Sequence, residues 1–553
     1  MMAVHFTTEL TKCTVCLSAP KVYKTKRRTV CSADTGCFVA VEHMRYCDRG
    51  HKRIVFRSER LKSIVNRGCT YANDVMVLSA TSRFTDGRVS GEIAAALDIG
   101  ISERHVRRLS NTALDVLVAI HGKGGDRLMA VIGGGWVLQI DGTVDGDYDM
   151  IVVVRDAVSG FVLYVVKCHS ESEASIEAVL SEIKSRYGTP VASMSDMRSG
   201  ILAAMEKVFP GIPIGLCKFH FLRDIGKDVM DYRHALLGKA LRRLGTKTAL
   251  KHALQSMPPY DMKLLREVGE GYCSDSAALA GMVARSMLEE LTDTGESSGR
   301  GFPFSVRHLE FITACVSALP SLRETNAAAG SEPVARAVEA LELLASDTLV
   351  TRVTEELRGI NTIFDKVRHA MYPEHRGTPL SDEPKRINAE MEGDCDIVMG
   401  ELDVYMHTNI PRYMLEAAKH ISGQYSRWKG NLFLKKLDGI AHTNNSLERV
   451  FRRARRNVRR RCGDMATGHQ LTLNGEKLLL FQNMSNSRYT EAVFGGGDIA
   501  AVFGRERALL PKTETMTRKK QAELLEKGRQ MLHAGNVPDT VYTDETWQAV
   551  QHG

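Results

Sequence analysis

The chain has 553 residues, of which 43% are apolar, and its formal net charge is +8. At roughly 150 residues per domain, this length provides for three or four domains, each able to bury its own core. Apolar runs fall short of the ~20 residues of a membrane helix, and the opening MMAVHFTTELTK lacks the apolar stretch of a signal peptide. We therefore expect no membrane association, and the 12 scattered Cys favour a reducing, cytoplasmic compartment over a disulfide framework.

The first 70 residues are basic and carry two pairs of potential metal ligands. They hold 14 Lys and Arg against 5 acids, as expected of a segment that neutralises phosphates. Cys13 and Cys16 are followed, about 30 residues later, by Cys47 and His51. This spacing predicts a tetrahedral Cys₃His zinc site, structural in so small a segment, or else a set of unconnected buried cysteines. Three residues between the pairs could replace one ligand: Cys31, Cys37 and His43.

The next segment, SGEIAAALDIGISERHVRRLSNTALDVLVAIH, has the pattern of a helix-turn-helix. Two short apolar faces flank a break at Asp98-Ile99-Gly100, and Ser102 can cap the second helix. That helix, from Ser102 to about Ser110, would direct three arginines toward the major groove of DNA: Arg104, Arg107 and Arg108. The alternative is a generic helical hairpin, but the small Ala94–Ala96 and the basic second helix favour DNA binding.

From Trp136 the pattern changes to strands. WVLQIDGT, MIVVVRDAVSG and FVLYVVKC predict a β-meander. SEASIEAVLSEIKSRYG has helical spacing and ends at Gly188, PVASMSD is a short buried strand, a helix runs to about Val208, and IPIGLCKFH predicts another strand. Three strands, helix, strand, helix, strand is the order of an RNase H-like fold, in which acids on the first and fourth strands become neighbours.

Three acids stand where such a fold would collect them. Asp141 ends the run WVLQID, Asp196 ends PVASMSD, and Glu448 lies in TNNSLERVFRRARRNVRRR, directly before a stretch of 8 Arg with no acid. Three carboxylates can hold a pair of Mg²⁺ ions for phosphodiester chemistry. Among the arginines that follow on the same helix, we expect four to contact DNA phosphates: Arg452, Arg453, Arg456 and Arg459.

Other acids in this region have simpler interpretations. The cluster DGDYD lacks the Gly of an EF-hand loop, since Met150 stands there, and is predicted to be a solvated hairpin turn. Asp156 is predicted to be a turn residue, and Asp224 and Asp228 to lie on a solvated helix face. The DGDYD acids are Asp145, Asp147 and Asp149.

Residues 225–439 are mostly helical by pattern, with 3.6-residue spacing sustained in VARAVEALELLASDTLVTRVTEELRGINTIFDKVRHAM. Trp428, just before the arginine-rich helix, is expected to pack in a core or to stack on an unpaired base. Residues 486–553 suggest a mixed-charge helix around 519–532 and carry no chemistry that we can assign.

The segments IDGT, SDMRSG, Cys217-Lys218-Phe219-His220 and TNNSLERVFRR, in this order, resemble DDE transposases of the Mutator-like and related bacterial insertion-sequence groups. GFPFS resembles them more weakly. The resemblance covers roughly residues 1–485 and implies that Asp141, Asp196 and Glu448 are the metal-binding triad. Cys217 and His220 match the C-x2-H element that follows the second acid. They are expected to be either a buried Cys and a hydrogen-bonding His near the site or catalytic groups.

The expected architecture is an α/β RNase H-like catalytic core interrupted by a large all-α insertion, with an amino-terminal zinc ribbon and helix-turn-helix. Its parts are 1–70 (zinc ribbon), 75–122 (helix-turn-helix), 130–225 and 439–485 (core), 226–438 (insertion) and 486–553 (tail).

The resemblance implies a bacterial, nucleoid-associated transposase that cleaves transposon ends and joins the 3′-OH to target DNA, using two Mg²⁺ (or Mn²⁺) per active site beside the structural Zn²⁺. Its partners would be terminal inverted repeats, target DNA and further copies of itself in a homodimer or higher oligomer, which the helical insertion would help to assemble. The alternative function is a catalytically inactive DNA-binding regulator derived from a transposase.

Overall fold

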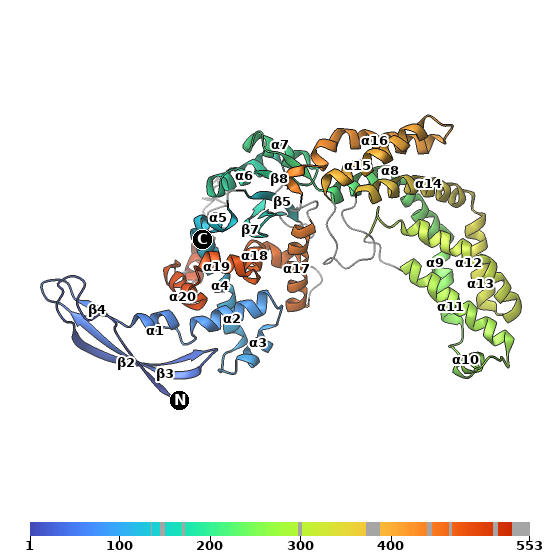
Figure 1. Cartoon of the computed structure of the whole chain (residues 1–553). Coiled ribbons are helices and arrows are strands. Elements are labelled where there is room, and N and C mark those ends of the chain that lie inside the picture. Colours follow the sequence, from blue (N-terminus) through green and yellow to red (C-terminus); the bar gives the residue numbers. More distant parts are fainter. Residues whose placement is uncertain are drawn as a thin grey trace.

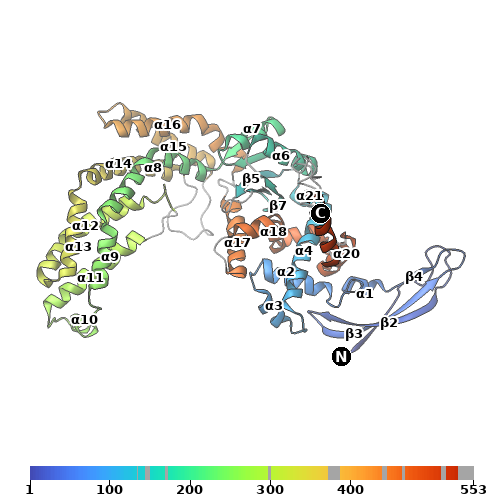
Figure 2. The ribbon, with the colours of Figure 1, turned by 180° about the vertical axis from the view of Figure 1, so that it is seen from behind.

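The computed structural model describes residues 1–133, 135–143, 150–168, 172–296, 301–371, 387–438, 445–463, 467–511 and 518–533. The chain forms a long arch with an amino-terminal β-ribbon at one end, a helical block at the other and a central sheet between them (Figures 1 and 2). The DGDYD acids lie outside the described residues. No helix in the described part combines the length and hydropathy needed to cross a membrane.

The amino-terminal ribbon is built on a long antiparallel hairpin. Its strands are β1 (Ala3–Thr7), β2 (Lys21–Ser32), β3 (Gly36–Cys47) and β4 (Ile54–Phe56). β3 lies between β2, with which it pairs in antiparallel orientation, and β1, with which it pairs in parallel orientation. β4 pairs with the carboxyl-terminal end of β3. Helix α1 (Glu59–Ile64) covers one face through Leu61, which packs with Val30 and Phe38.

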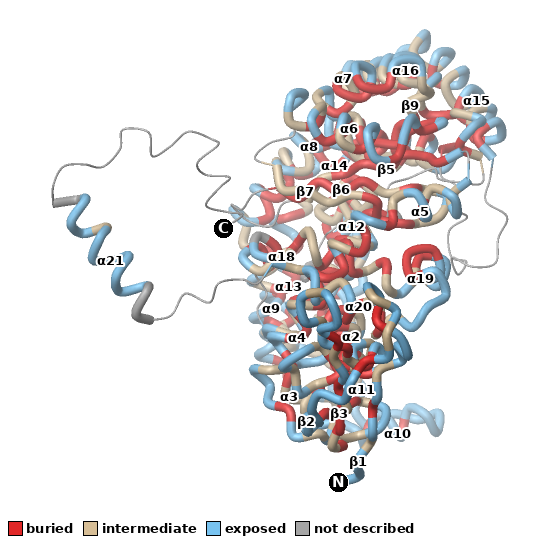
Figure 3. The backbone as a smooth tube through the Cα atoms, turned by 90° about the vertical axis from the view of Figure 1, so that its left-hand side faces the viewer, coloured by how far each residue is buried: buried red, intermediate tan, exposed pale blue. Residues whose placement is uncertain are grey.

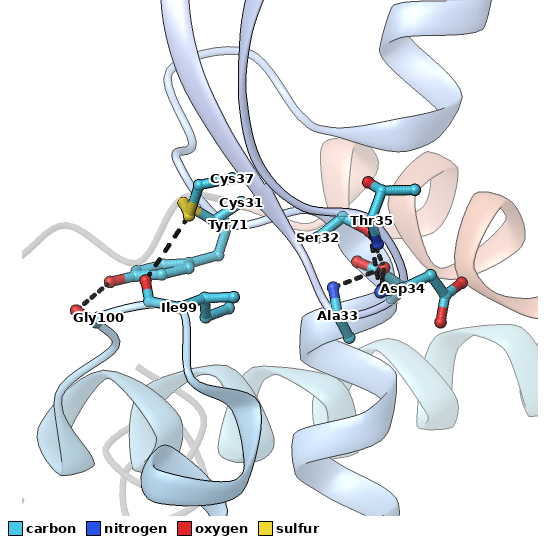
Figure 4. The surroundings of a disulfide bond; sticks show 10 residues. Cys31, Ser32, Ala33, Asp34, Thr35, Cys37, Tyr71, Ile99 and Gly100 are labelled. Atoms are coloured by element: carbon cyan, nitrogen blue, oxygen red, sulfur yellow. Dashed lines mark hydrogen bonds between the residues drawn. A yellow bond between two sulfur atoms is a disulfide. The ribbon is translucent and has the colours of Figure 1, made fainter. Parts of the chain in front are cut away.

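A disulfide between Cys31 and Cys37 closes the hairpin where it meets the helices (Figure 4). This corrects the expectation that either cysteine could replace a zinc ligand, because the two are directly opposite in the hairpin register and bond each other. The same end is fixed to the next helix by Asp74, whose carboxylate accepts hydrogen bonds from the Ser32 hydroxyl and the backbone N–H of Ala33.

The predicted helix-turn-helix falls on three helices, α2 (Asn73–Phe84), α3 (Ser90–Leu97) and α4 (Glu103–Lys123). Ser102 caps α4 as predicted, accepting a hydrogen bond from the His105 N–H at 3.3 Å. α4 does not end near Ser110, however. Apolar residues continue along its buried side, including Leu114 and Leu117, so it extends into the central core. Helix α5 (Gly125–Ile132) then leads to the sheet.

The central sheet has the strand order β7-β6-β5-β8-β9. Its strands are β5 (Val137–Thr143), β6 (Met150–Asp156), β7 (Val162–Cys168), β8 (Ala192–Ser195) and β9 (Ile214–Leu216). β5, β6 and β7 form the predicted antiparallel meander, whereas β8 is parallel to β5 and β9 is parallel to β8. The intervening helices α6 (Glu173–Tyr187) and α7 (Ser199–Val208) lie where the sequence predicts them.

Different helices cover the two faces of this sheet, because strand side chains alternate between faces. Val152 and Val154 share a core with α6. Ile151 and Val153 face the opposite way and pack against Phe451 of α17 (Asn445–Cys462) and against α18 (Gly468–Phe481). Residues distant in sequence are therefore joined on one face of the sheet.

The helical block packs around its own core, which is separate from that of the sheet. Its helices are α8 (Lys218–Leu244), α9 (Thr246–Ser256), α10 (Met262–Gly269), α11 (Ser276–Glu296), α12 (Arg307–Ala329), α13 (Glu332–Ser346), α14 (Thr348–Met371), α15 (Asn388–Met406) and α16 (Arg412–Leu432), with the 3₁₀ turn η1 (Lys435–Leu437) after them. The first helix begins earlier than predicted, since β9 ends at Leu216 and the Cys217 carbonyl already accepts a helical hydrogen bond from Phe221 N–H. Cys217 and His220 therefore lie at a helix start and not at a strand end.

The chain ends with η2 (Gln482–Ser485), α19 (Ser487–Phe494), α20 (Ile499–Leu509) and α21 (Arg518–His533). Although this segment was expected to be a tail, α20 packs against α1, α2 and α4, and Phe494 and Phe503 are buried. α21 corresponds to the predicted mixed-charge helix and is exposed, whereas buried residues gather in the sheet and between the helices (Figure 3).

Candidate active site and metal centre

Two of the predicted acids are placed side by side by the parallel pairing of β5 and β8. Gln139 lies opposite Met194 in this register, so two residues further on Asp141 is opposite Asp196. Both carboxylates are buried, with 7% and 3% of their residue surface exposed. The carboxyl end of these strands therefore holds two adjacent, largely desolvated acids.

The third acid reaches the same end of the sheet on α17. Asp141 pairs with Val153 across β5 and β6, so its side chain is on the face that α17 covers. Arg455 of α17 donates a hydrogen bond to the Thr143 hydroxyl at the end of β5. Glu448 is in the first turn of α17, its side chain one-third exposed and its carboxylate 3.9 Å from the Arg452 guanidinium.

The charges of the other two acids act on Asp141. Burial, together with the negative charges of Asp196 and Glu448, raises the pKa of Asp141 to about 7, against the lowering effect of a hydrogen bond from the Gly142 N–H. Burial also raises the pKa of Asp196, opposed by the Arg198 N–H. Mutually repelling, desolvated carboxylates are a donor set that a divalent cation stabilises, so these residues fit Mg²⁺ or Mn²⁺.

Basic and polar groups beside Asp196 complete this region. The Arg198 Nε is 3.0 Å from Asp196 Oδ2, and the charge of Arg223 lowers the Asp196 pKa while that of Asp224 raises it. Neither arginine is among the residues predicted from the sequence. Arg198 follows Asp196 by two residues in SDMRSG and could have been selected, but Arg223 comes close only through the start of α8.

A cavity of about 500 Å³ lies next to Asp196, between α7, α8 and α16. Met197 and Ser199 line it near the strand end, Asp224 and Asp228 line it from α8, and Trp428 lines it from α16. The expectation of a solvated face holds for Asp228, which is exposed, whereas Asp224 is half-buried. Trp428 packs partly against the helical core and partly faces this cavity.

Cys217 and His220 are both buried beside the acids. Cys217 packs with Val137 and Met194, and its N–H donates to the Ser195 carbonyl at 2.8 Å. Burial, aided by the charge of Arg223, lowers the pKa of His220 to about 4, so its imidazole is neutral at physiological pH. Lys218 between them is also buried, which lowers its pKa to about 8, and its Nζ donates to Asn388 Oδ1 at 2.6 Å.

The predicted zinc ligands gather at the outer end of the amino-terminal ribbon. Cys13, Cys16, Cys47 and His51 have ligand atoms that all lie within 4.8 Å of one another, and this Cys₃His cluster can hold a zinc ion. The His51 Nδ1 donates to the Lys52 carbonyl at 2.8 Å, so Nε2 faces the sulfurs, 3.3 Å from the Cys13 Sγ. In the described part of the chain, only this Cys₃His cluster has three or more potential ligand atoms within 4.8 Å of one another. The carboxylates of Asp141, Asp196 and Glu448 are spaced more widely.

The arginines selected for DNA contact differ in exposure. On α4, Arg104, Arg107 and Arg108 are all exposed, and the Arg108 Nη2 lies 2.6 Å from the His105 Nε2. On α17, Arg452, Arg453 and Arg456 are exposed. Arg459 is half-buried. Surface position is therefore compatible with DNA contact at most of these residues.

No family model and no curated protein matches the chain. Among solved structures, a chain of the "Drosophila P element transposase strand transfer complex" is similar at a TM-score of 0.31 and 10% sequence identity, over 78% of this chain and 96% of that chain. A likeness this distant assigns neither a fold family nor an activity.

Proposed function

We propose that the protein is a DNA transposase with an RNase H-like core, in which Asp141, Asp196 and Glu448 hold two Mg²⁺ (or Mn²⁺) ions. The observation that supports it most is the convergence of the three acids on one end of the sheet, two from neighbouring parallel strands and one from a helix that packs over the same face. The strand order β7-β6-β5-β8-β9 is the order that an RNase H-like core requires.

The proposed chemistry follows from what surrounds the acids. When bound, the two cations supply electrostatic stabilisation of the attacking and leaving oxygens in an in-line phosphodiester displacement. Asp141 and Asp196 are fixed by the strands, so they present their charge without rearrangement. The exposed arginines of α17 hold the DNA backbone beside Glu448. Water then releases a 3′-OH at the transposon end, and the same site directs that hydroxyl onto a target phosphodiester, with no covalent bond between protein and DNA.

The remaining parts have roles consistent with this chemistry. The Cys₃His ribbon and the helix-turn-helix, with Arg104, Arg107 and Arg108 exposed on α4, would bind the terminal inverted repeats. The helical block, which separates β9 from α17 in sequence, would contact end DNA and assemble two or more copies of the chain. Cys217 and His220 would support the acid site from beneath, because both are buried and His220 is neutral.

The decisive experiment is a cleavage and joining assay. The full-length protein is incubated with Mg²⁺ and a labelled duplex that carries an end of the DNA element encoding it, and nicked and joined products are separated. Asp141→Asn, Asp196→Asn and Glu448→Gln should each reduce cleavage by about 10³-fold or more while end binding persists, because the acids hold metal and basic residues supply DNA affinity.

Asp228→Asn is the matched control, since it removes one exposed acid close to the same site. It should leave end cleavage close to wild type. Full activity in any one of the three acid variants removes that residue from the site. Tight end binding by a wild-type protein that never cleaves supports the inactive regulator instead.

A further inference from the structure

The carboxyl-terminal half of α17 is joined to the helix-turn-helix. Asn457 is buried, and its Nδ2 donates to the Phe84 carbonyl at the end of α2, at 2.9 Å. One turn further, the Arg460 Nη1 donates to the Asp86 carbonyl at 3.2 Å. Both views show α17 passing from the sheet down to α2 (Figures 1 and 2). The helix that carries Glu448 thus ends against the amino-terminal DNA-binding module.

Close packing makes this junction specific. Gly87 follows Asp86 with φ +72°, which only glycine adopts readily, and a Cβ there would meet the Arg460 Cδ at 3.2 Å and the Asn457 Nδ2 at 3.4 Å. The Asn457 Oδ1 accepts a hydrogen bond from the Arg461 Nε at 2.6 Å, so one buried amide holds both the α2 end and an α17 arginine. The relative position of the two helices is therefore fixed by side-chain fit as well as by burial.

Four arginines from the two sides meet here, and we call Arg83, Arg107, Arg460 and Arg461 the junction surface. The Arg83 and Arg461 guanidiniums lie over the Phe84 ring, with 5.3 and 5.0 Å from Cζ to the ring centroid. The Arg83 Nη1 also donates to the carbonyl of Arg107, at 3.4 Å.

The junction surface is a concentration of like charge. Burial, together with the charges of Arg461 and Arg107, lowers the pKa of Arg83 to about 10. None of the four arginines forms an ion pair within the described part of the chain, although Asp86 lies exposed in the same turn. Crowded guanidiniums without acidic partners are costly alone and complement the phosphates of a nucleic acid.

We propose that the junction surface binds the backbone of a DNA duplex and carries it from the helix-turn-helix to the acids on the sheet. The identity of the ligand as DNA rests on the proposed function. Arg460 is about 18 Å from Glu448 along α17, at 1.5 Å per residue, a distance that about five base pairs span. One duplex can therefore contact both ends of this helix, with Asn457 keeping the two binding elements in register.

The test measures binding alone, so it does not depend on catalysis. Full-length protein is titrated with a fluorescent 30-base-pair duplex of mixed sequence, over a range of salt concentrations and without added divalent metal. Arg460→Gln should lower the slope of log affinity against log salt by roughly 0.9, the value for one lost phosphate contact, and Arg107→Gln/Arg460→Gln by about twice that. Arg460→Lys, which keeps the charge, should restore most of the slope.

Arg352→Gln is the matched control, an exposed arginine on α14 of the helical block. A slope for Arg460→Gln equal to that of this control overturns the junction surface, and so does a wild-type protein that binds no duplex. If instead the slopes change as expected but no end is ever cleaved, the junction surface stands and the proposed transposase activity fails.

Discussion

The described part of the chain has two candidate metal centres that are assembled in opposite ways. The Cys₃His cluster comes from two short segments of one small ribbon, and its ligand atoms lie within 4.8 Å of one another. The acid site takes Asp141 and Asp196 from neighbouring strands and Glu448 from a helix that follows the whole helical block. One site is set by local sequence, and the other is set by sheet register and by the packing of α17.

This difference predicts different roles for metal at the two sites. The ribbon has a small core, centred on residues such as Val30 and Phe38, so a bound zinc contributes directly to its folding. The sheet is covered by helices on both faces, and this packing holds the repelling carboxylates together. A bound zinc ion would thus stabilise the ribbon, whereas the packing of the sheet and of α17 positions the acids.

The largest effect is therefore expected from loss of a zinc ligand. Cys47→Ser should reduce zinc from about one per chain to none and remove roughly 10 kcal/mol or more of binding free energy from the ribbon. Metal analysis by mass spectrometry and hydrogen exchange of the full chain would show it, with fast exchange in β2 and β3 and unchanged exchange in β5 and β6. Cys273→Ser, at an exposed cysteine outside the cluster, should change neither. A metal-free but protected ribbon would contradict a structural role for zinc.

A second test compares two buried acids of the sheet. Asp141 carries a pKa raised to about 7, so its folded state binds a proton that the unfolded state releases near pH 4. Stability should fall as pH rises between these two pKa values, by roughly 4 kcal/mol in total. In metal-free buffer above pH 7, Asp141→Asn should therefore raise the melting temperature and abolish stabilisation by added Mg²⁺.

Asp156→Asn should do the opposite. The Asp156 carboxylate is buried and accepts hydrogen bonds from the backbone N–H groups of Val137, Val158 and Ser159, as the predicted turn residue. An amide leaves one of these donors unpaired, which costs about 1–3 kcal/mol, and Mg²⁺ stabilisation should persist. Both melting temperatures are measured by calorimetry with and without Mg²⁺. A lower melting temperature for Asp141→Asn would mean that this carboxylate is structural.

The sequence predicts elements and local sites well because their signals are short-range. The strands at Asp141 and Asp196, helix α6 and its end at Gly188, the Ser102 cap and the Cys₃His cluster all depend on spacing within a few turns or one hairpin. The adjacency of Asp141 and Asp196 also follows from the predicted strand order, since parallel neighbours align their ends.

Contacts between segments distant in sequence could not be predicted from the sequence. Nothing near Cys31 distinguishes a disulfide partner from a metal ligand until the hairpin register places Cys37 opposite it. The start of α8 at Lys218 was hidden because the apolar run IPIGLC leads into it without a break. The contacts of Asn457 and Arg455 require α17 to be placed on α2 and β5. The charge density of α17 predicts that it binds phosphates but does not show which arginines face the protein.

The smallest effects concern that last distinction, for which α17 offers an adjacent pair. Arg456 is exposed, whereas Arg455 is half-buried and hydrogen-bonded to Thr143 at the end of β5. Arg456→Gln should lower the salt slope of duplex binding by roughly 0.9, as one lost phosphate contact, with little change in the Mg²⁺ concentration that supports half-maximal end cleavage. Arg455→Gln should leave the slope unchanged and raise that Mg²⁺ concentration, because the helix that carries Glu448 loses a bond to the strand of Asp141. If both variants alter only the slope, α17 serves DNA binding alone and the acid site does not depend on how this helix packs.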